Sequence, residues 1–102
     1  MEILLEPQAF AQETITVGST AVGFTAATYK PSGAGAAKRA LVTVRGAQIA
    51  VAVGGTTPTG STDGHLWNVG EIWRVVGIND ITSFLAIRAG TTGGNIHVTY
   101  ER

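Results

Sequence analysis

The last third of the chain is a succession of short alternating segments separated by glycine, asparagine and aspartate, and this pattern constrains the fold more than any other feature. In the final segment, residues 95–101, apolar side chains alternate with polar ones. Such alternation is typical of a β-strand with one face on a core and the other in water. We therefore expect four short strands here, at residues 66–67, 71–76, 83–89 and 95–101.

Similar patterns in the first two thirds predict four more strands, at residues 13–17, 22–28, 38–45 and 47–53. Before Gly46 the apolar positions expected to face the core are even-numbered, as in Val42 and Val44. After it they are odd-numbered, as in Ile49 and Val51. A change of parity at a glycine indicates a bulge or a tight turn. Eight short strands without a competing amphipathic helix predict an all-β, two-sheet β-sandwich, jelly-roll-like in outline.

The chain of 102 residues fits one domain. Residues 1–12 show no sustained period, and Pro7 interrupts any helix, so we expect an extended N-terminal arm at 1–12 and a single β-sandwich domain at 13–102. Residues 54–64 contain no aliphatic side chain, which predicts a surface loop.

Charge and composition argue against several kinds of partner. Seven basic and seven acidic side chains cancel, so the charge attraction expected of nucleic-acid binders is missing. The N-terminal segment is acidic where a signal peptide is basic, and its apolar stretch is shorter than a membrane span, which predicts an intracellular product without a membrane partner. Since the chain has no cysteine, core packing and partner subunits must stabilise it.

No group of residues predicts chemistry. The two histidines, His65 and His97, are 32 positions apart, and a metal site needs three or four converging ligands. Ser61, Asp63 and His65 lie too close in sequence for the geometry of a catalytic triad. We therefore predict no catalytic, cofactor-binding or metal-binding residue, no cofactor, no enzymatic activity and no small-molecule substrate.

Large apolar side chains without an obvious place in the core are the candidates for a partner interface. Of the two tryptophans, we expect one in the core and one in an interface. The residues predicted to contact a partner are Ile3, Leu4, Leu5, Phe10 and Trp67. Basic residues gather in the middle of the chain, and they are either ordinary solvated charges or a patch that the acidic arm of another subunit contacts; they are Lys30, Lys38, Arg39 and Arg45.

The segments HLW (65–67), GEIW (70–73), GINDI (77–81), FLAIR (84–88) and IHVTYE (96–101) resemble small structural proteins of tailed bacteriophages. Within that group, the chain is most similar to capsid cement or decoration proteins. The resemblance implies a non-enzymatic β-sandwich that binds the major capsid protein on the outside of the shell and stabilises it. It also implies a homotrimer, made in the host cytoplasm and located in the virion.

Two other functions are compatible with a small sandwich. One is a carbohydrate- or receptor-binding or adaptor module of a phage tail or fibre, with Trp67 and residues 54–64 as a platform for sugar stacking. The other is a cupin-like enzyme, but cupins resemble one another in grouped histidine and glutamate ligands that this sequence lacks.

Overall fold

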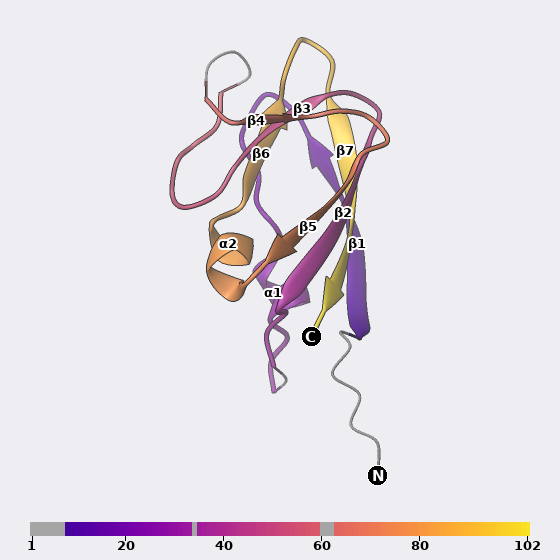
Figure 1. The fold of residues 1–102 in the computed structure, drawn as a ribbon, viewed down its shortest axis with the longest axis vertical. Coiled ribbons are helices and arrows are strands. Elements are labelled where there is room, and N and C mark those ends of the chain that lie inside the picture. Colours follow the sequence, from indigo (N-terminus) through magenta and orange to yellow (C-terminus); the bar gives the residue numbers. More distant parts are fainter. Residues whose placement is uncertain (1–7, 34, 60–62) are drawn as a thin grey trace.

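Two antiparallel sheets face each other in the described part of the chain, residues 8–33, 35–59 and 63–102 of a computed structural model (Figure 1). The larger sheet holds, in spatial order, β1 (Ala9–Val17), β7 (Gly94–Glu101), β2 (Arg39–Arg45) and β5 (Ile72–Val76). The smaller sheet holds β4 (His65–Trp67), β3 (Ile49–Ala52) and β6 (Leu85–Arg88). The predicted all-β sandwich is therefore confirmed.

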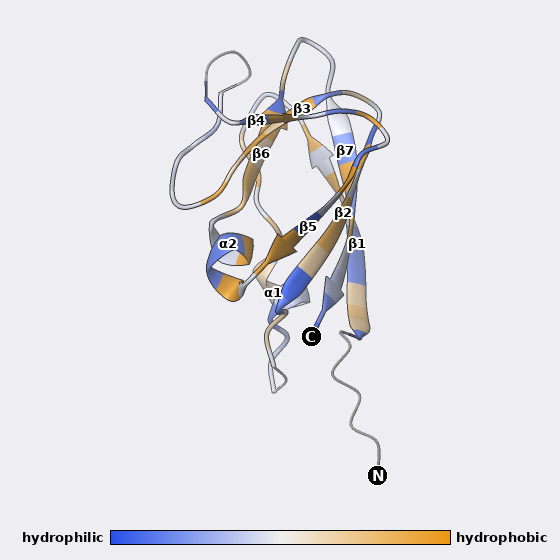
Figure 2. Ribbon diagram, viewed as in Figure 1, coloured by the Kyte–Doolittle hydropathy of each residue, from blue (hydrophilic) through white to orange (hydrophobic). Residues whose placement is uncertain are grey.

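The core lies between the sheets and follows from the sequence alternation. Every second side chain of β7 and of β2 is buried, while the residues between them are half-buried or exposed on the outer face. Apolar and polar bands follow one another along β7 in Figure 2. The facing side of the core comes from the smaller sheet and from Phe84, which stacks on Phe24 with ring centroids 4.0 Å apart. Ile49, Ile81 and Tyr100 are fully buried within this cluster.

The described residues form seven strands rather than the eight expected. The predicted strand at 22–28 is a single bridge between Val22 and Ala86, followed by the short helix α1 (Ala26–Tyr29). Alanine is the strongest helix former, and an alternation built on small residues specifies a strand only weakly. Phe24 nevertheless points into the core, as the alternation predicts.

A second helix, α2 (Ile78–Ser83), replaces the predicted turn after residue 76 and the start of the predicted strand at 83. Ile81 is fully buried on this helix, whereas Ile78 is 41% exposed. A six-residue helix can carry little apolar periodicity, because it has fewer than two turns. The sequence pattern therefore could not distinguish α2 from a loop.

The turn predicted at Gly46 is confirmed. Gly46 has φ of 85°, a backbone conformation that side chains other than glycine rarely adopt. The chain leaves the larger sheet at Arg45 and enters the smaller one at Ile49. The expected alternation in β3 is wrong, since all four of its residues are buried; the strand is central in its sheet.

The first strand begins earlier than the sequence indicated. β1 starts at Ala9, and Gln8 exchanges two backbone hydrogen bonds with Arg102, at 3.1 and 3.0 Å. The predicted boundary between arm and domain, after Gln12, therefore falls inside a strand of the larger sheet. Residues 1–7 lie outside the described part of the chain.

Candidate interaction surface

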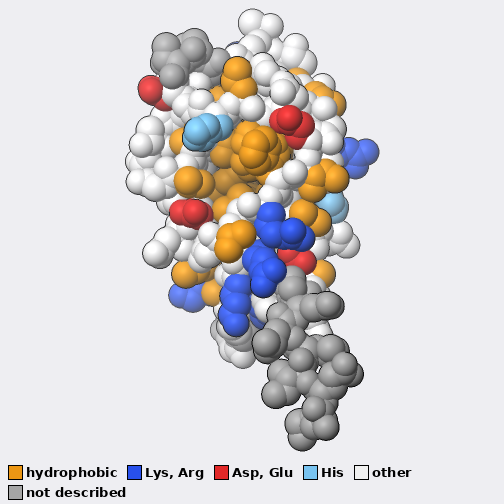
Figure 3. Space-filling view, viewed as in Figure 1, with side chains coloured by type: hydrophobic (Ala, Val, Ile, Leu, Met, Phe, Trp, Pro, Cys, Tyr) orange, Lys and Arg blue, Asp and Glu red, His pale blue; other side chains and the backbone are white. Residues whose placement is uncertain are grey.

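The two tryptophans form a stacked pair that bridges the two sheets. Trp67 ends β4 and Trp73 lies in β5; their ring centroids are 4.8 Å apart and their planes differ by 6°. Trp67 is only 6% exposed, whereas Trp73 is 40% exposed. One face of the Trp73 ring covers Trp67, and part of the Trp73 side chain remains open to solvent. An apolar patch occupies the middle of the face drawn in Figure 3.

A carboxylate fixes the rim of this pair. The indole N–H of Trp73 donates a hydrogen bond to Oε1 of Glu71 at 3.4 Å. The same oxygen accepts a hydrogen bond from the backbone N–H of Asn68 at 2.7 Å. The turn between β4 and β5 is thereby tied to the exposed ring, so the ring orientation is supported by the backbone as well as by stacking.

Exposed apolar side chains concentrate in one segment, which we call the crossover segment, residues 65–78. Seven large hydrophobic side chains are exposed among the described residues, and six of them lie in this segment. They are Leu66, Val69, Ile72, Trp73, Val76 and Ile78. Single exposed apolar residues are common on soluble proteins, but a concentration of them indicates a surface that contacts another molecule.

The outer face of β5 combines apolar and basic side chains. Ile72 and Val76 are 64% and 60% exposed, with Arg74 between them. On the neighbouring strand β2, Leu41 pairs with Arg74 and Arg39 pairs with Val76. A row of basic side chains runs below the apolar patch in Figure 3. This corner of the larger sheet therefore offers both apolar area and positive charge.

One acidic side chain lies close to this corner. Arg74 Nε is 3.5 Å from Glu101 Oε1, and this is the one ion pair within the described ranges. Arg39 has no ion pair or side-chain hydrogen bond with any residue that the structure describes. The positive charge of the corner is therefore only partly compensated.

The inner side of β1 carries a polar contact of a different kind. The Tyr100 hydroxyl donates a hydrogen bond to Glu13 Oε2 at 2.6 Å, and the Thr25 hydroxyl donates to Glu13 Oε1 at the same distance. Burial of Tyr100, together with the negative charge of Glu13, raises the pKa of Tyr100 far above its ordinary value of 10.0. This contact stabilises the protein, and nothing about it indicates catalysis.

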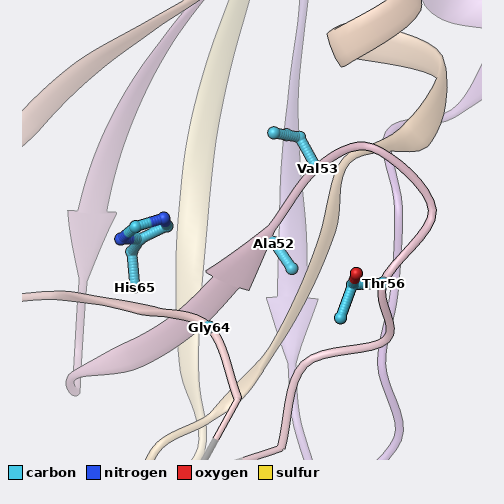
Figure 4. A pocket seen from close by; sticks show the side chains of 5 residues that line it. All are labelled: Ala52, Val53, Thr56, Gly64 and His65. Carbon is cyan, nitrogen blue, oxygen red and sulfur yellow. The ribbon is translucent and has the colours of Figure 1, made fainter.

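The histidines lie apart, in different surroundings. The ring nitrogens of His97 make hydrogen bonds with Gln12 Oε1 at 3.0 Å and with Thr14 Oγ1 at 3.1 Å on the outer face of the larger sheet. His65 borders a shallow depression that is also lined by Val53 and Thr56 (Figure 4). Within the described ranges, no group of three or more His, Cys, Asp or Glu residues is placed to hold a metal ion.

The predicted interface residues have different positions. Ile3, Leu4 and Leu5 lie outside the described residues. Phe10 is half-buried at the start of β1, with the Arg102 guanidinium carbon 4.1 Å from its ring centroid. Trp67, expected at the surface, is buried, because Trp73 covers it; the exposed tryptophan is Trp73.

Sequence reasoning missed Ile72, Val76 and Ile78 as surface residues. A signal was available in β5, where residues 71–76 carry large apolar side chains on both faces of the strand. In a two-layer sandwich only one face of a strand can meet the core, so one of these apolar faces had to point outward; the structure shows that it is the face with Ile72 and Val76.

No family model, no curated protein and no solved structure matches this chain. Among the described residues, no helix is long and apolar enough to cross a membrane. The fold and the surface define a small β-sandwich with an exposed apolar crossover between its sheets.

Proposed function

We propose that this chain is a non-enzymatic structural protein that attaches to a larger protein assembly. The observation that carries this proposal is the crossover segment, which gathers six of the seven exposed large hydrophobic side chains of the described residues. Protein contacts use such area, since each Å² of apolar surface removed from water contributes about 25 cal/mol. The stacked tryptophans also give the segment a rigid centre, and buried aromatic anchors dominate the energy of many interfaces.

The specific role we propose is a capsid cement or decoration protein of a tailed bacteriophage. The support for this role is the sequence resemblance together with a compact all-β sandwich that has an apolar surface. On this proposal the major capsid protein is the partner, the chain acts as a homotrimer, and it is made in the host cytoplasm and ends on the outer surface of the virion. Repetition on a symmetric shell would add avidity to each modest contact.

Binding to capsids of the virus that encodes the chain tests this role. Leu66 and Val69 are more than half exposed, so the double variant Leu66→Asp/Val69→Asp should fold normally. We expect its affinity for the shell to fall by about tenfold or more, because charged groups would be buried at the contact. The matched control is Thr56→Asp/Thr57→Asp, which adds the same charge to an exposed loop. Unchanged capsid occupancy of the Leu66/Val69 variant contradicts the proposal.

A second candidate function is a carbohydrate- or receptor-binding module of a tail or fibre. The observation that favours it is the Trp73 ring, which is 40% exposed and held parallel to Trp67. Flat exposed aromatic rings provide apolar area with defined geometry for stacking. A glycan array probed with wild type and with Trp73→Ala tests this function. A signal that Trp73→Ala abolishes supports it, and the absence of any signal with wild type rules it out.

A further inference from the structure

The outer edge of β5 is open among the described residues. β5 is the last strand of the larger sheet, and within the described ranges β2 is the one strand that pairs with it. At the two ends of β5, the Val44 N–H donates to the Glu71 carbonyl at 3.0 Å and the Gly77 N–H donates to the Lys38 carbonyl at 2.8 Å, so Glu71 and Gly77 direct these groups at β2. Because the direction of the backbone groups alternates along an antiparallel strand, those of Ile72, Arg74 and Val76 point away from β2. They can pair with one more strand.

The side chains at this edge define the chemistry of that strand. Ile72 and Val76 are mostly exposed and apolar, and the Arg74 side chain is 47% exposed between them. Arg39 and Lys38 lie next to Val76 and Gly77 on the neighbouring strand. Val76 therefore lies between Arg74 on one side and Arg39 and Lys38 on the other. Glu101 pairs with Arg74, whereas Arg39 and Lys38 have no ion pair within the described ranges, so the corner carries excess positive charge. A complementary segment would be short, apolar opposite Val76 and acidic on either side of that position.

The chain itself contains such a segment. Residues 2–6 read Glu-Ile-Leu-Leu-Glu, with three consecutive aliphatic residues between two acids. The chain has seven acidic residues. Glu2 and Glu6 are the one neighbouring pair of them that encloses a run made only of aliphatic residues. Charge complementarity therefore points to this segment as the occupant of the β5 edge.

The geometry of the sheet favours an arm from another copy. Three strand spacings separate β1 from β5, which is about 14 Å at ~4.8 Å each. An extended chain covers about 3.3 Å per residue, so the five residues from Pro7 back to Glu2 span roughly 17 Å. Crossing the sheet would use almost all of this length. The arm of the same copy therefore cannot also run along β5.

We propose that residues 2–6 of a second copy of this chain bind along the free edge of β5 as an added strand. Leu4 then lies beside Val76, and the two glutamates lie near Arg39 and Arg74 on the same outer face. Ile3 and Leu5 point to the opposite face of the added strand, the face of β5 that carries Trp73.

This inference rests on the proposed function, because Ile72 and Val76 belong to the crossover segment. It names a partner for the part of that segment that lies in β5. The contact joins two different surfaces of the chain. Two copies can therefore exchange their arms, or several copies can form a closed ring, such as a homotrimer.

Sedimentation of the full chain in the absence of any capsid tests the inference. We expect wild type to self-associate, and both Glu2→Arg/Glu6→Arg and Arg39→Glu/Arg74→Glu to weaken self-association by about tenfold or more. Combining all four substitutions should restore it, because the charges are then exchanged between the partners. The control is Arg45→Glu, which reverses an exposed charge at the other end of β2 and should leave self-association unchanged.

A crosslink tests the same contact by a second route. It is needed because the charge reversal Arg39→Glu/Arg74→Glu places new acids near Glu101. The native chain has no cysteine, so Leu4→Cys and Val76→Cys can be mixed as two separate proteins. We expect a disulfide between position 4 of one copy and position 76 of the other. Mixing Leu4→Cys with Thr16→Cys, an exposed site on β1, is the matched control and should give little product.

Three results would overturn the inference. They are a monomeric wild type at concentrations up to about 1 mM, self-association that is insensitive to both charge reversals, or crosslinking to position 16 as efficient as to position 76. A monomer that still binds capsids through Leu66 and Val69 would refute this inference and the proposed homotrimer, and it would leave the proposed attachment to the capsid intact. Self-association of wild type without binding to capsids would leave this inference intact and refute the proposed attachment to the capsid.

Discussion

The two edge strands of the larger sheet differ in what they present to water. On the outer face of β1 the exposed side chains are Gln12, Thr14 and Thr16, and two of these bond to His97. On the outer face of β5 they are Ile72, Arg74 and Val76. A polar edge remains stable in water, whereas an apolar edge with free backbone groups tends to pair. The comparison indicates that β5, rather than β1, is the edge of the sheet suited to contact with another molecule.

The inner sides of the same two strands differ as well. Beneath β1, Glu13 is joined to Tyr100 and Thr25 by short hydrogen bonds. Beneath β5, Trp73 makes a stacking contact with Trp67. The first contact is directional and depends on charge, whereas the second depends on apolar area and remains partly open to solvent.

The largest effect is expected at the tryptophan pair. Trp67→Ala should lower the free energy of unfolding by about 3–5 kcal/mol, because it leaves a cavity next to Phe84, whose ring centroid is 5.8 Å from that of Trp67. Trp73→Ala should lower it by only about 1–2 kcal/mol, since that ring is already partly solvated. Chemical denaturation of both variants measures the difference. Equal losses would show that Trp73 is a core residue and not an exposed contact residue.

A smaller effect is expected beneath β1. Tyr100→Phe removes the hydrogen bond to Glu13 and should lower the free energy of unfolding by about 1.5–3 kcal/mol at neutral pH. The pKa of Tyr100 is raised in the folded protein, so this tyrosine ionises first in the unfolded chain. Its contribution is therefore complete below about pH 10 and declines as the pH rises above that value.

Denaturation as a function of pH checks this contribution. The difference between wild type and Tyr100→Phe should be constant at neutral pH and shrink on the alkaline side of pH 10, roughly the ordinary tyrosine pKa. Ultraviolet absorbance of the folded wild type should show a tyrosine that resists ionisation there. A difference that grows with pH would mean that Tyr100 ionises more easily in the folded protein, contrary to its buried contact with Glu13.

The smallest effect on stability is expected on the outer face of β5. Ile72→Thr/Val76→Thr makes this edge resemble β1, and it should change the free energy of unfolding of the isolated chain by no more than about 0.5 kcal/mol, because both side chains are mostly exposed. Threonine retains the β-branched shape that suits a strand. Thermal denaturation at low protein concentration measures this effect. A loss above 2 kcal/mol, roughly that of a buried side chain, would mean that these residues belong to the core of the single chain.

The alternating strands could be predicted from sequence because their pattern is local. In β7, the inward set of Ile96, Val98 and Tyr100 follows directly from a period of two. The Gly46 turn was predictable for the same reason, since the switch of the apolar positions from even to odd numbers can be seen in the sequence itself. The helices were not, because α1 and α2 are four and six residues long, which is fewer than two turns each and too short for an apolar period to repeat.

The candidate surface was only partly predictable. The sequence indicated that one tryptophan would be buried and one would be in contact with a partner, and it named Trp67 for the contact. Both residues lie in short strands with apolar neighbours, so their exposure depends on which strand is covered by the other sheet. Only the packing of β4 against β5 shows that Trp67 lies underneath.

By itself, the sequence determined the two-sheet character of this protein and the inward set of each long strand, because strand geometry converts spacing along the chain into faces of a sheet. The tertiary structure alone decided the order of the strands, which places β5 at an open edge with Ile72 and Val76 exposed. Strand order depends on contacts between residues far apart in the chain, and these contacts leave no period in the sequence.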